Sequence, residues 1–577
     1  MKHVNWPWTI GFVIALAIGS AAATLLGNYW LFLFTGAVIA AIALKGIGLV
    51  AGRAGMIALS QMAFAGIGAW TVAYLNVWQV PGTLFLWVPI GGLVAVPFGI
   101  AIALPALRLR GIHFAIVTLG FAAAFDSILA ATTFPGQTQF IQVPRPPGFT
   151  SVPMYFYFVV AVYAVISIAL DIVSRTPLGA SWVGIKHSER GTAAHGVSVA
   201  WSKLTAFAIA AFVSGVSGGL LAGQLQTLVS DSFNIMVSLI YYAVTVMAGA
   251  HLAEGALIGG MLIIFFPELM RRLNLPQDIG NIAFALGATQ ALSMGGSIAA
   301  DLRGGLRRLR RKVGIRPKTY PEVMRKAGQI TPPPVAEGAR SVLSIKGLGV
   351  KYGQVVALDN VDVEVPEGAV IGLIGPNGAG KSTLIDAVTG FLPSYQGAIT
   401  LDGGKLDGLD AHKRARAGLR RTWQTTRIPA ELTVGSYLNM AARRGLAPAE
   451  MDEILQWIGC PHPSTPIATV DVGTRRLLDV AGVVAARPKI VLLDEPAAGQ
   501  SYEESLFLAQ RITEIPEKFG ASVVLVEHDI DMVRKACNSI YVLDFGRVIA
   551  AGPPAVALED PDVVRAYVGA VEEETAA

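Results

Sequence analysis

Residues 375–383, with the sequence GPNGAGKST, have the residue types and spacing of a phosphate-binding loop. Glycines let the backbone wrap closely around an anion, so that successive N–H groups and the N-terminus of the next helix point at the phosphates. We expect Lys381 to reach the β- and γ-phosphates of ATP and the Ser382 hydroxyl to ligate Mg²⁺. The apolar run 370–374 places the loop after a strand, which favours an ATP site over an ordinary glycine-rich turn. The predicted nucleotide contacts from this loop are Gly375, Asn377, Gly378, Gly380, Lys381, Ser382 and Thr383.

The composition of the chain is uneven. Hydrophobic residues make up 53% of the 577 residues and charged residues only 15%, which indicates an integral membrane protein. The charged residues are concentrated after residue 300, where the phosphate loop also lies. The two cysteines, Cys460 and Cys537, lack the C-x-x-C spacing of a metal or redox site, and we expect ordinary buried thiols.

Apolar runs long enough, or nearly long enough, to cross a bilayer fill the first 300 residues and predict about ten spans. The first run could instead be a cleaved signal peptide, because it follows a short basic start. The two shortest runs, 57–75 and 255–270, are rich in glycine and are candidates for broken helices that line a pathway. The runs are 8–27, 29–51, 57–75, 82–104, 112–131, 153–173, 204–228, 234–252, 255–270 and 280–300.

Basic residues predict the orientation of these spans. With the N-terminus inside, Arg108, Arg175 and the basic cluster that follows residue 300 all lie on the cytoplasmic side. We interpret that cluster as a membrane anchor at the lipid surface and not as a nucleic-acid site, although the net charge is +5. The pair Arg271 and Arg272 falls outside in this arrangement, so either a short run is re-entrant or the rule is broken there.

Two segments of the membrane half resemble the permeases of branched-chain amino-acid ABC importers. They are 55–70 (GMIALSQMAFAGIGAW) and 108–121 (RLRGIHFAIVTLGF), and the resemblance covers most of 45–265. We take Gln61 and Gly66 as candidates for the transport pathway. The family usually carries a glutamate shortly after the second segment, whereas this chain has Asp126. Asp126 is either a pathway residue or a partner in a helix–helix or headgroup contact.

The polar loop 181–196 is similar to the family's coupling loop, which carries a short cytoplasmic helix that docks on the ATPase. Mixed charge with alanine and glycine on one face suits a protein contact better than lipid. Lys186, Glu189 and Arg190 are the predicted coupling residues, and a merely solvated loop is the alternative.

The chain divides into a permease domain at 1–312, a linker at 313–341 and an ATPase domain at 342–577. The linker is basic and then proline-rich, which predicts an extended, semi-rigid tether. From Val342 onward, apolar strands alternate with helical stretches, as in an α/β nucleotide-binding fold. The predicted fold is therefore a polytopic α-helical membrane domain followed by an α/β P-loop ATPase of the ABC type.

The order of motifs after residue 342 resembles ABC ATPases, above all the ATPase subunit of the same importers. The resemblance implies that Tyr352 stacks on adenine, although it could instead be a strand-end packing residue. Gln424 is then expected to reach Mg²⁺ and the attacking water, and Asp494 to hold Mg²⁺. Glu495 would polarise the water, and His528 would contact the γ-phosphate.

The signature segment departs from the family's LSGGQ-like pattern. Asp471 stands at the serine position, and two like charges about 4 Å apart repel by roughly 1 kcal/mol in water and roughly 4 at an effective dielectric of 20. Val472 blocks the close backbone approach that glycine permits. Ser501 likewise replaces the aspartate of many ABC ATPases.

We predict an asymmetric dimer in which the site that uses this signature hydrolyses poorly. Alternatively, Asp471 points away and both sites work. The segment comprises Val470, Asp471, Val472, Gly473 and Thr474.

These features predict ATP-driven import of a branched-chain amino acid or similar small polar solute across the cytoplasmic (inner) membrane. Because ABC transporters need two permeases and two ATPases, the resemblance implies a second permease, a different second ATPase and an extracytoplasmic binding protein, with no nucleic-acid partner. A nucleotide-sensing regulatory subunit is the rival hypothesis, against which Glu495 and His528 argue. An importer of urea, amides or carboxylates and, less readily, an exporter are further alternatives.

Overall fold

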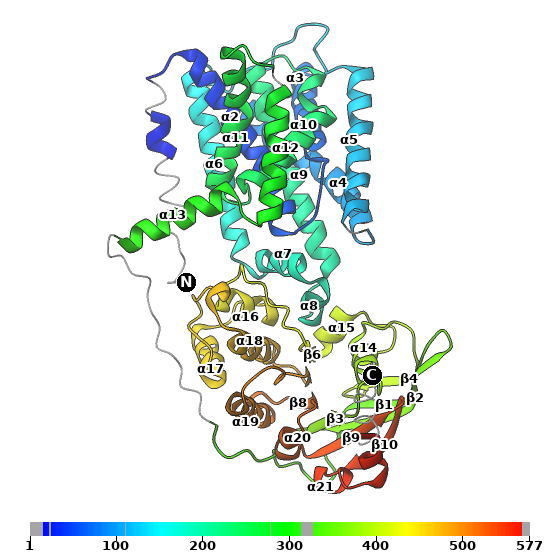
Figure 1. Cartoon of the computed structure of the whole chain (residues 1–577). Helices are drawn as coiled ribbons and strands as arrows, with labels where there is room; N and C mark the ends of the chain where they lie inside the picture. Colours follow the sequence, from blue (N-terminus) through cyan, green and yellow to red (C-terminus); the bar gives the residue numbers. More distant parts are fainter. Residues whose placement is uncertain (1–15, 22–24, 110, 277, 313–326, 568–577) are drawn as a thin grey trace. The chain divides into compact units, whose positions relative to one another are not determined.

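The computed structural model describes residues 16–21, 25–109, 111–276, 278–312 and 327–567, and the chain forms two compact units. One unit contains residues 1–174 and 200–318, and the other contains 175–199 and 319–577. The segment 175–199 therefore groups with the ATPase, although it lies between membrane helices in the sequence. Figure 1 traces the chain and labels its elements.

Apart from the basic helix α13 (Ile298–Lys312), the membrane unit is a bundle of apolar helices that run roughly side by side (Figure 1). The helix α2 continues into a π-helical turn at Leu49–Arg53, and a short 3₁₀ turn at Ser230–Phe233 precedes α10. The helices are α2 (Asn28–Gly48), α3 (Gln61–Val77), α4 (Leu84–Ala106), α5 (Ile112–Thr132), α6 (Val152–Ser174), α9 (Val199–Leu225), α10 (Ile235–Ala248), α11 (Ala253–Arg272), α12 (Asp278–Met294) and α13 (Ile298–Lys312).

The span count of about ten is too high for the part of the chain that the structure describes. Seven helices there are long and apolar enough to cross a membrane. The run 57–75 forms the 17-residue α3, which is short for a span. The run 280–300 is not one straight helix, because α12 and α13 bend by 61° at the break between them, and it adds an eighth candidate only if the bent pair is counted as one broken span. Most of the first run, 8–27, and with it the question of a signal peptide, lies outside the described residues.

The glycines of α3 serve close helix packing. A Cβ on Gly68 would lie 2.1 Å from the Gly215 oxygen of α9, and a Cβ on Gly218 would lie 1.8 Å from the Ala65 oxygen of α3. Backbones that approach this closely require small residues, as is common at helix interfaces in membranes. Gly68 thus serves packing between α3 and α9, and a pathway role for this run stays a prediction.

The arginine pair at the end of α11 is compensated by a neighbouring carboxylate. Glu268 accepts from Arg271 Nε (2.8 Å) and Arg272 Nε (2.7 Å), and Arg272 also lies 4.6 Å from the ring of Trp30 at the start of α2. At its other end, α11 carries Glu254, which pairs with Arg303 of α13. The helix is continuous over 20 residues and is long and apolar enough to span a membrane. Glu268 offsets one of the two positive charges of the pair, and the side of the membrane on which the pair lies stays a prediction.

The ATPase unit contains a four-stranded antiparallel sheet and a six-stranded, mostly parallel sheet (Figure 1). The strand order is β2-β1-β4-β5 in the first sheet and β10-β9-β3-β8-β7-β6 in the second. The strands are β1 (Ser341–Tyr352), β2 (Val355–Pro366), β3 (Val370–Ile374), β4 (Gln396–Leu401), β5 (Gly404–Lys405), β6 (Leu419–Arg421), β7 (Ile490–Asp494), β8 (Ser522–Val526), β9 (Ser539–Asp544) and β10 (Arg547–Gly552).

The helices of this unit pack around the parallel sheet. Alternate residues of β3 point into two separate cores, because successive side chains of a strand face opposite sides. One core contains α18 and α19, and the other contains α14 and the antiparallel sheet. The helices are α7 (Pro177–His187), α8 (Glu189–Ala194), α14 (Lys381–Thr389), α15 (Ala411–Ala417), α16 (Val434–Ala442), α17 (Pro448–Ile458), α18 (Val472–Val484), α19 (Tyr502–Phe519), α20 (Ile530–Ala536) and α21 (Pro554–Ala557), with a 3₁₀ turn at Ile467–Thr469.

The described part of the linker lies along the ATPase unit. Gly328 N donates to Gln510 Oε1 (2.7 Å), and Asn538 Nδ2 donates to the Pro333 oxygen (2.7 Å). Residues 313–326, the first part of the predicted tether, lie outside the described residues. The proline-rich stretch is thus held by the ATPase surface over residues 328–333.

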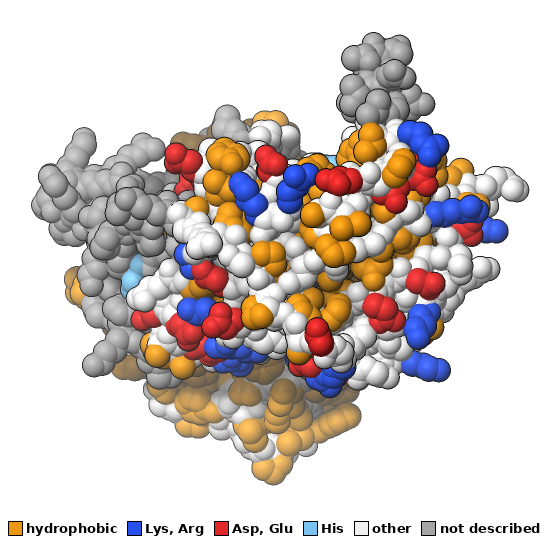
Figure 2. Space-filling model, turned by 90° about the horizontal axis from the view of Figure 1, so that it is seen from below, with side chains coloured by type: hydrophobic (Ala, Val, Ile, Leu, Met, Phe, Trp, Pro, Cys, Tyr) orange, Lys and Arg blue, Asp and Glu red, His pale blue; other side chains and the backbone are white. Residues whose placement is uncertain are grey.

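Figure 2 shows acidic and basic side chains mixed over one face of the ATPase unit, with hydrophobic side chains between them. Ion pairs such as Lys489–Asp402 (2.5 Å) and Arg340–Glu367 (2.7 Å) lie on the unit's surface. A mixed surface of this kind produces no large field of one sign, whereas nucleic-acid binding relies on a basic patch.

Candidate functional site

The phosphate loop lies between β3 and α14, at the carboxyl end of the parallel sheet. A Cβ on Gly375 would lie 2.1 Å from the Leu543 oxygen, and Gly380 has a φ of 105°, so both positions require glycine. Lys381 Nζ donates to the oxygens of Gly375 (2.6 Å) and Pro376 (2.9 Å) across the loop. Burial lowers the pKa of Lys381, and the nearby carboxylates of Glu495 and Asp494 oppose this effect. The loop therefore presents one cation and a helix N-terminus, which together suit a polyphosphate.

Parallel strands bring the predicted catalytic residues to the same edge of the sheet. Glu495 follows β7, Gln424 follows β6 and His528 follows β8. Glu495 Oε2 accepts from Gln424 Nε2 (2.7 Å), and Glu495 Oε1 lies 2.9 Å from His528 Nε2. Glu495 has a φ of 46°, a strained conformation for a residue with a side chain. A carboxylate held between an amide and an imidazole at the mouth of a phosphate loop can polarise a water molecule.

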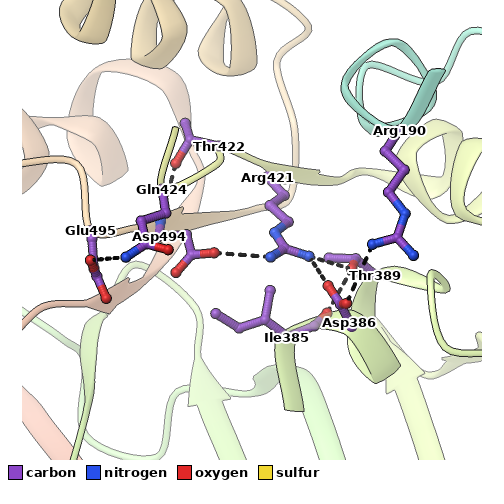
Figure 3. A network of polar contacts seen from close by, with 9 residues as sticks. All are labelled: Arg190, Ile385, Asp386, Thr389, Arg421, Thr422, Gln424, Asp494 and Glu495. Atoms are coloured by element: carbon purple, nitrogen blue, oxygen red, sulfur yellow. Dashed lines mark hydrogen bonds and ion pairs between the residues drawn. The ribbon is translucent and has the colours of Figure 1, made fainter. Parts of the chain in front are cut away.

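Asp494 ends β7 and is nearly buried, and a residue that the sequence analysis missed binds it. Arg421 Nη2 donates to Asp494 Oδ2 (2.9 Å), as Figure 3 shows. Arg421 ends the short strand β6 and directly precedes the Thr422–Trp423–Gln424 stretch. Its position three residues before the predicted glutamine, Gln424, could have marked Arg421 as a candidate site residue. An arginine between Arg420 and Thr422 in the sequence, however, does not reveal which carboxylate it meets.

The oxygen donors of this site fit a hard divalent cation. The Ser382 hydroxyl, the Asp494 carboxylate and the Gln424 carbonyl are ligands of the type that Mg²⁺ prefers. Within the described ranges, no group of three or more His, Cys, Asp or Glu side chains could hold a metal by itself. This is expected for Mg²⁺, which takes one or two protein carboxylates and completes its shell with phosphate oxygens and water.

Tyr352 lies at the end of β1, opposite Val355 in the hairpin, and its residue surface is 52% exposed. The structure therefore leaves much of the ring accessible, as a stacking role requires. Its adenine contact stays a prediction.

The predicted signature segment forms the N-terminus of α18. Asp471 caps this helix: Oδ1 accepts from Thr474 N (2.8 Å) and Oδ2 from the Thr474 hydroxyl (2.5 Å). Val472 is 68% exposed. A Cβ on Gly473 would lie 3.1 Å from Glu504 Oε1, so this position is tight. The positive end of α18 is thus already compensated by a carboxylate of its own chain.

Known proteins match both units of the chain. A family model described as ABC transporter matches residues 358–498, and one described as branched-chain amino acid transport system / permease component matches residues 28–282. The high-affinity branched-chain amino acid transport ATP-binding protein BraF of Pseudomonas aeruginosa is 33% identical over 252 residues, which cover 40% of this chain and 99% of BraF. The chain belongs to the ABC transporter family. It joins the permease and the ATP-binding component of a branched-chain amino-acid-type ABC transporter in one membrane protein.

Another relative and a solved structure are also similar to this ABC transporter. The corresponding LivG protein of Salmonella typhimurium is also 33% identical over 252 residues, covering 40% of this chain and 99% of LivG. A solved ATP-binding cassette of an ABC transporter in its ADP conformation is 27% identical, with a TM-score of 0.37, and covers 40% of this chain and 100% of that chain. The ATPase unit is an ATP-hydrolysing cassette of the ABC type.

The predicted coupling segment of this ABC transporter is helical and packs on its ATPase unit. Trp182 of α7 is fully buried, and Ala180 and Val183 join the core that contains α18 and α19. Lys186 Nζ lies 3.4 Å from Glu431 Oε1, and Arg190 Nη1 lies 4.0 Å from Asp386 Oδ2. The segment is therefore not merely a solvated loop.

The first turn of α8 is organised by Ser188, which caps the helix through Gly191 N (3.0 Å). Glu189 is the first residue of α8, where an acidic side chain suits the helix dipole. Arg427 Nη1 donates to Ser188 Oγ (3.2 Å), so the ATPase contacts the start of the helix directly.

The three pathway candidates in the membrane unit make packing contacts in this structure. Gln61 is buried, and its Oε1 accepts from Ser214 Oγ (2.9 Å) on α9. A Cβ on Gly66 would lie 2.3 Å from the Phe125 ring, and Asp126 Oδ2 accepts from Ile235 N (3.3 Å) at the start of α10. These contacts favour the helix–helix alternative for Asp126, and a pathway role for the three residues stays a prediction.

A buried polar chain joins α8 to α18. Tyr437 Oη donates to Asp479 Oδ1 (3.0 Å) and lies 3.2 Å from His195 Nε2. Burial, with the nearby Arg420, lowers the pKa of His195 to about 3, and burial raises the pKa of Asp479 to about 6. These residues are isolated in the sequence, so only their contacts reveal the network.

We expect the free energy of docking α8 to depend on pH through both His195 and Asp479, with effects of opposite sign. The pKa of His195 is lowered from 6.5, so its stabilising contribution is present above pH 6.5 and is lost as the pH falls. The pKa of Asp479 is raised from 3.8, so the docked state gains stability as the pH falls from 6 toward 3.8. Each group changes the free energy of docking by at most ~1.4 kcal/mol per pH unit. The two changes offset each other over the pH range in which both groups titrate, from 6 to 3.8.

Hydrogen exchange of the α8 amides, corrected for intrinsic rates, measures these slopes in the full chain. Asp479→Asn should leave the histidine slope, so that α8 opens more as the pH falls from 6.5. His195→Gln should leave the carboxyl slope, so that α8 opens less as the pH falls from 6. The control is His187→Gln, an exposed histidine of the same segment, which should behave like the wild type. Identical pH dependence in all four proteins would contradict the prediction.

Proposed function

We propose that this chain imports a branched-chain amino acid or a similar small polar solute across the cytoplasmic membrane, with its ATPase in the cytosol. The observation that carries the proposal is the fusion itself. A branched-chain-type permease model matches residues 28–282, and an ABC cassette model matches 358–498 of the same polypeptide. Relatives of the cassette carry names of branched-chain amino-acid transport proteins. One ATPase thus always accompanies one permease.

In the proposed mechanism, Lys381 leaves the carbonyl oxygens of its own loop to bind the β- and γ-phosphates of ATP. Tyr352 stacks on the adenine, and the backbone N–H groups from Gly375 to Thr383 hold the phosphates. Ser382, Asp494 and Gln424 hold Mg²⁺, which neutralises phosphate charge when bound.

Glu495 orients a water molecule and takes up its proton as the water attacks the γ-phosphate. Gln424 and His528 keep the carboxylate in place, as their contacts at 2.7 and 2.9 Å indicate. Contact of α7 and α8 with the cassette, through Lys186 of α7 and Glu189 and Arg190 of α8, transmits the ATPase cycle to the permease. The intact catalytic set disfavours the rival function of a regulatory subunit with little turnover.

We further propose an asymmetric ATPase dimer with a different partner cassette. Asp471 places a carboxylate at the N-terminus of α18, where family members present a serine hydroxyl and glycine N–H groups to the partner's ATP. The complete transporter then contains this chain, a second permease, a second ATPase and an extracytoplasmic substrate-binding protein. Two copies of this chain alone would carry the weak signature in both sites.

Uptake by the reconstituted complex tests the proposed function. The tagged chain is purified with its partners, which mass spectrometry identifies, and the complex is placed in proteoliposomes with the binding protein. We expect ATP-dependent accumulation of radiolabelled leucine. Accumulation of urea or a short carboxylate in its place would reassign the substrate. Hydrolysis without uptake of any of these solutes, or transport in the opposite direction, would contradict the import proposal.

A further inference from the structure

We propose that Arg421 relays the position of the coupling helix α8 to the metal-binding carboxylate Asp494. Docked α8 holds Asp494 away from the metal, and undocked α8 releases it. This inference rests on the proposed function, because it takes Asp494 as a Mg²⁺ ligand. It adds a positioning residue and a direction of coupling to that function.

Arg421 is shared between two carboxylates. Its Nη1 binds Asp386 Oδ1 on α14, and its Nη2 donates to Asp494 Oδ2 (2.9 Å) at the end of β7, as Figure 3 shows. The Arg421 side chain is only 4% exposed, so water scarcely competes for it. One buried guanidinium therefore compensates two anions, and a change in one pair must alter the other.

The coupling helix supplies the second cation of the cluster. Arg190 of α8 reaches the other oxygen of Asp386, at 4.0 Å between Nη1 and Oδ2 (Figure 3). Its side chain is 56% exposed, and its guanidinium also lies 5.8 Å from the Phe391 ring. The outer ion pair is thus solvated and readily broken, whereas the inner pairs are buried.

Charge counting gives the direction of the effect. Arg190 and Arg421 balance Asp386 and Asp494 when α8 is docked. When Arg190 leaves, the remaining three groups carry a net charge of −1. Asp386 then draws more strongly on Arg421, and the hold of Arg421 on Asp494 weakens. Because a carboxylate bound to an arginine is a poorer ligand for a cation, Asp494 becomes a better one.

A second contact ties Arg421 to the same turn of α8. The Trp423 ring lies between two guanidiniums, with Arg421 and Arg427 each 4.1 Å from its centroid. Arg427 in turn donates to Ser188, the residue that caps α8. The first turn of the coupling helix therefore reaches Arg421 by a charged route and by a stacked one.

Metal affinity of the full chain in detergent micelles tests the relay. Mn²⁺ replaces Mg²⁺ and is titrated by electron paramagnetic resonance in the presence of adenylyl imidodiphosphate, so turnover and the partner ATPase are not needed. We expect Arg190→Gln to tighten Mn²⁺ binding about two- to fivefold, because an exposed pair of this kind contributes little free energy. Lys518→Gln removes the same charge from an exposed ion pair at the end of α19, in which its partner is Glu453, and it should leave the affinity unchanged.

Two further backgrounds separate a relay from a general charge effect. In Asp386→Asn, where the link between the arginines is cut, Arg190→Gln should shift the Mn²⁺ affinity by less than its effect in the wild type. In Arg421→Lys, whose single ammonium cannot span both carboxylates, the shift should also be smaller than in the wild type. An equal shift in wild type and both backgrounds, or no shift at all, would overturn the relay alone. Failure of the wild type to bind Mn²⁺ with the nucleotide would overturn the proposed site as well.

Discussion

Replacing Glu495 by glutamine should reduce ATP hydrolysis of the reconstituted transporter by about 10²- to 10⁴-fold while ATP binding persists. The amide keeps the size of the side chain and can still meet Gln424 and His528, whose nitrogens lie 2.7 and 2.9 Å from the carboxylate. It cannot take up the proton of the attacking water. In the asymmetric dimer that we propose, the competent site uses this Glu495, so the whole complex should stop transporting.

The measurement is steady-state phosphate release, paired with nucleotide binding to the same preparation. Glu503→Gln is the matched control, because Glu503 is an exposed residue in the first turn of α19. It should leave hydrolysis within about twofold of the wild type. Undiminished turnover and uptake in Glu495→Gln would remove the catalytic assignment.

The residues of the proposed nucleotide site could be grouped from the sequence because they lie at the ends of strands. A glycine-rich loop after β3 and a pair of carboxylates after β7 are local patterns, and parallel strands bring their ends to one edge of the sheet. Lys381, Glu495 and His528 could therefore be named from sequence. The buried runs of β3, β7 and β8 made the fold of the ATPase unit equally visible.

The contacts between elements were not predictable in this way. Arg421 and Asp386 are separated by 35 residues in the chain, and nothing in either local sequence shows that they meet. His195 and Asp479 likewise become a network only through Tyr437. These are long-range contacts, and a hydrophobic pattern gives no information about them.

Hydropathy was also a poor guide to the number of spans. Gly295 has a positive φ and lies between α12 and α13, so an apolar run that would count as one span is broken there. The glycines of α3 suggested a pathway, but Gly68 of α3 and Gly218 of α9 permit close backbone contact between these two helices. Glycine in a membrane helix has both uses, and the sequence alone does not distinguish them.

Restoring the signature should raise hydrolysis. We expect the double substitution Asp471→Ser and Val472→Gly to increase turnover of the reconstituted complex about tenfold, which corresponds to ~1.4 kcal/mol. Serine keeps a cap at the start of α18, because its hydroxyl can accept from the backbone as Asp471 does from Thr474 N at 2.8 Å. Val472 is 68% exposed, so its removal should leave no buried cavity.

Single substitutions separate the two causes. Asp471→Asn removes the charge but keeps the size and the cap, so a rise in this variant measures repulsion of the phosphates. A rise in turnover in Val472→Gly alone measures the effect of closer approach of the backbone to the phosphates. If the carboxylate is fully engaged with Thr474 and directed away from the partner's ATP, neither variant nor the double substitution will raise turnover, and both sites of the dimer work as they stand. The signature of one cassette serves the nucleotide of the other. If the rise in turnover occurs only in complexes whose partner cassette has an intact phosphate loop, the weak signature therefore lies opposite the partner's ATP.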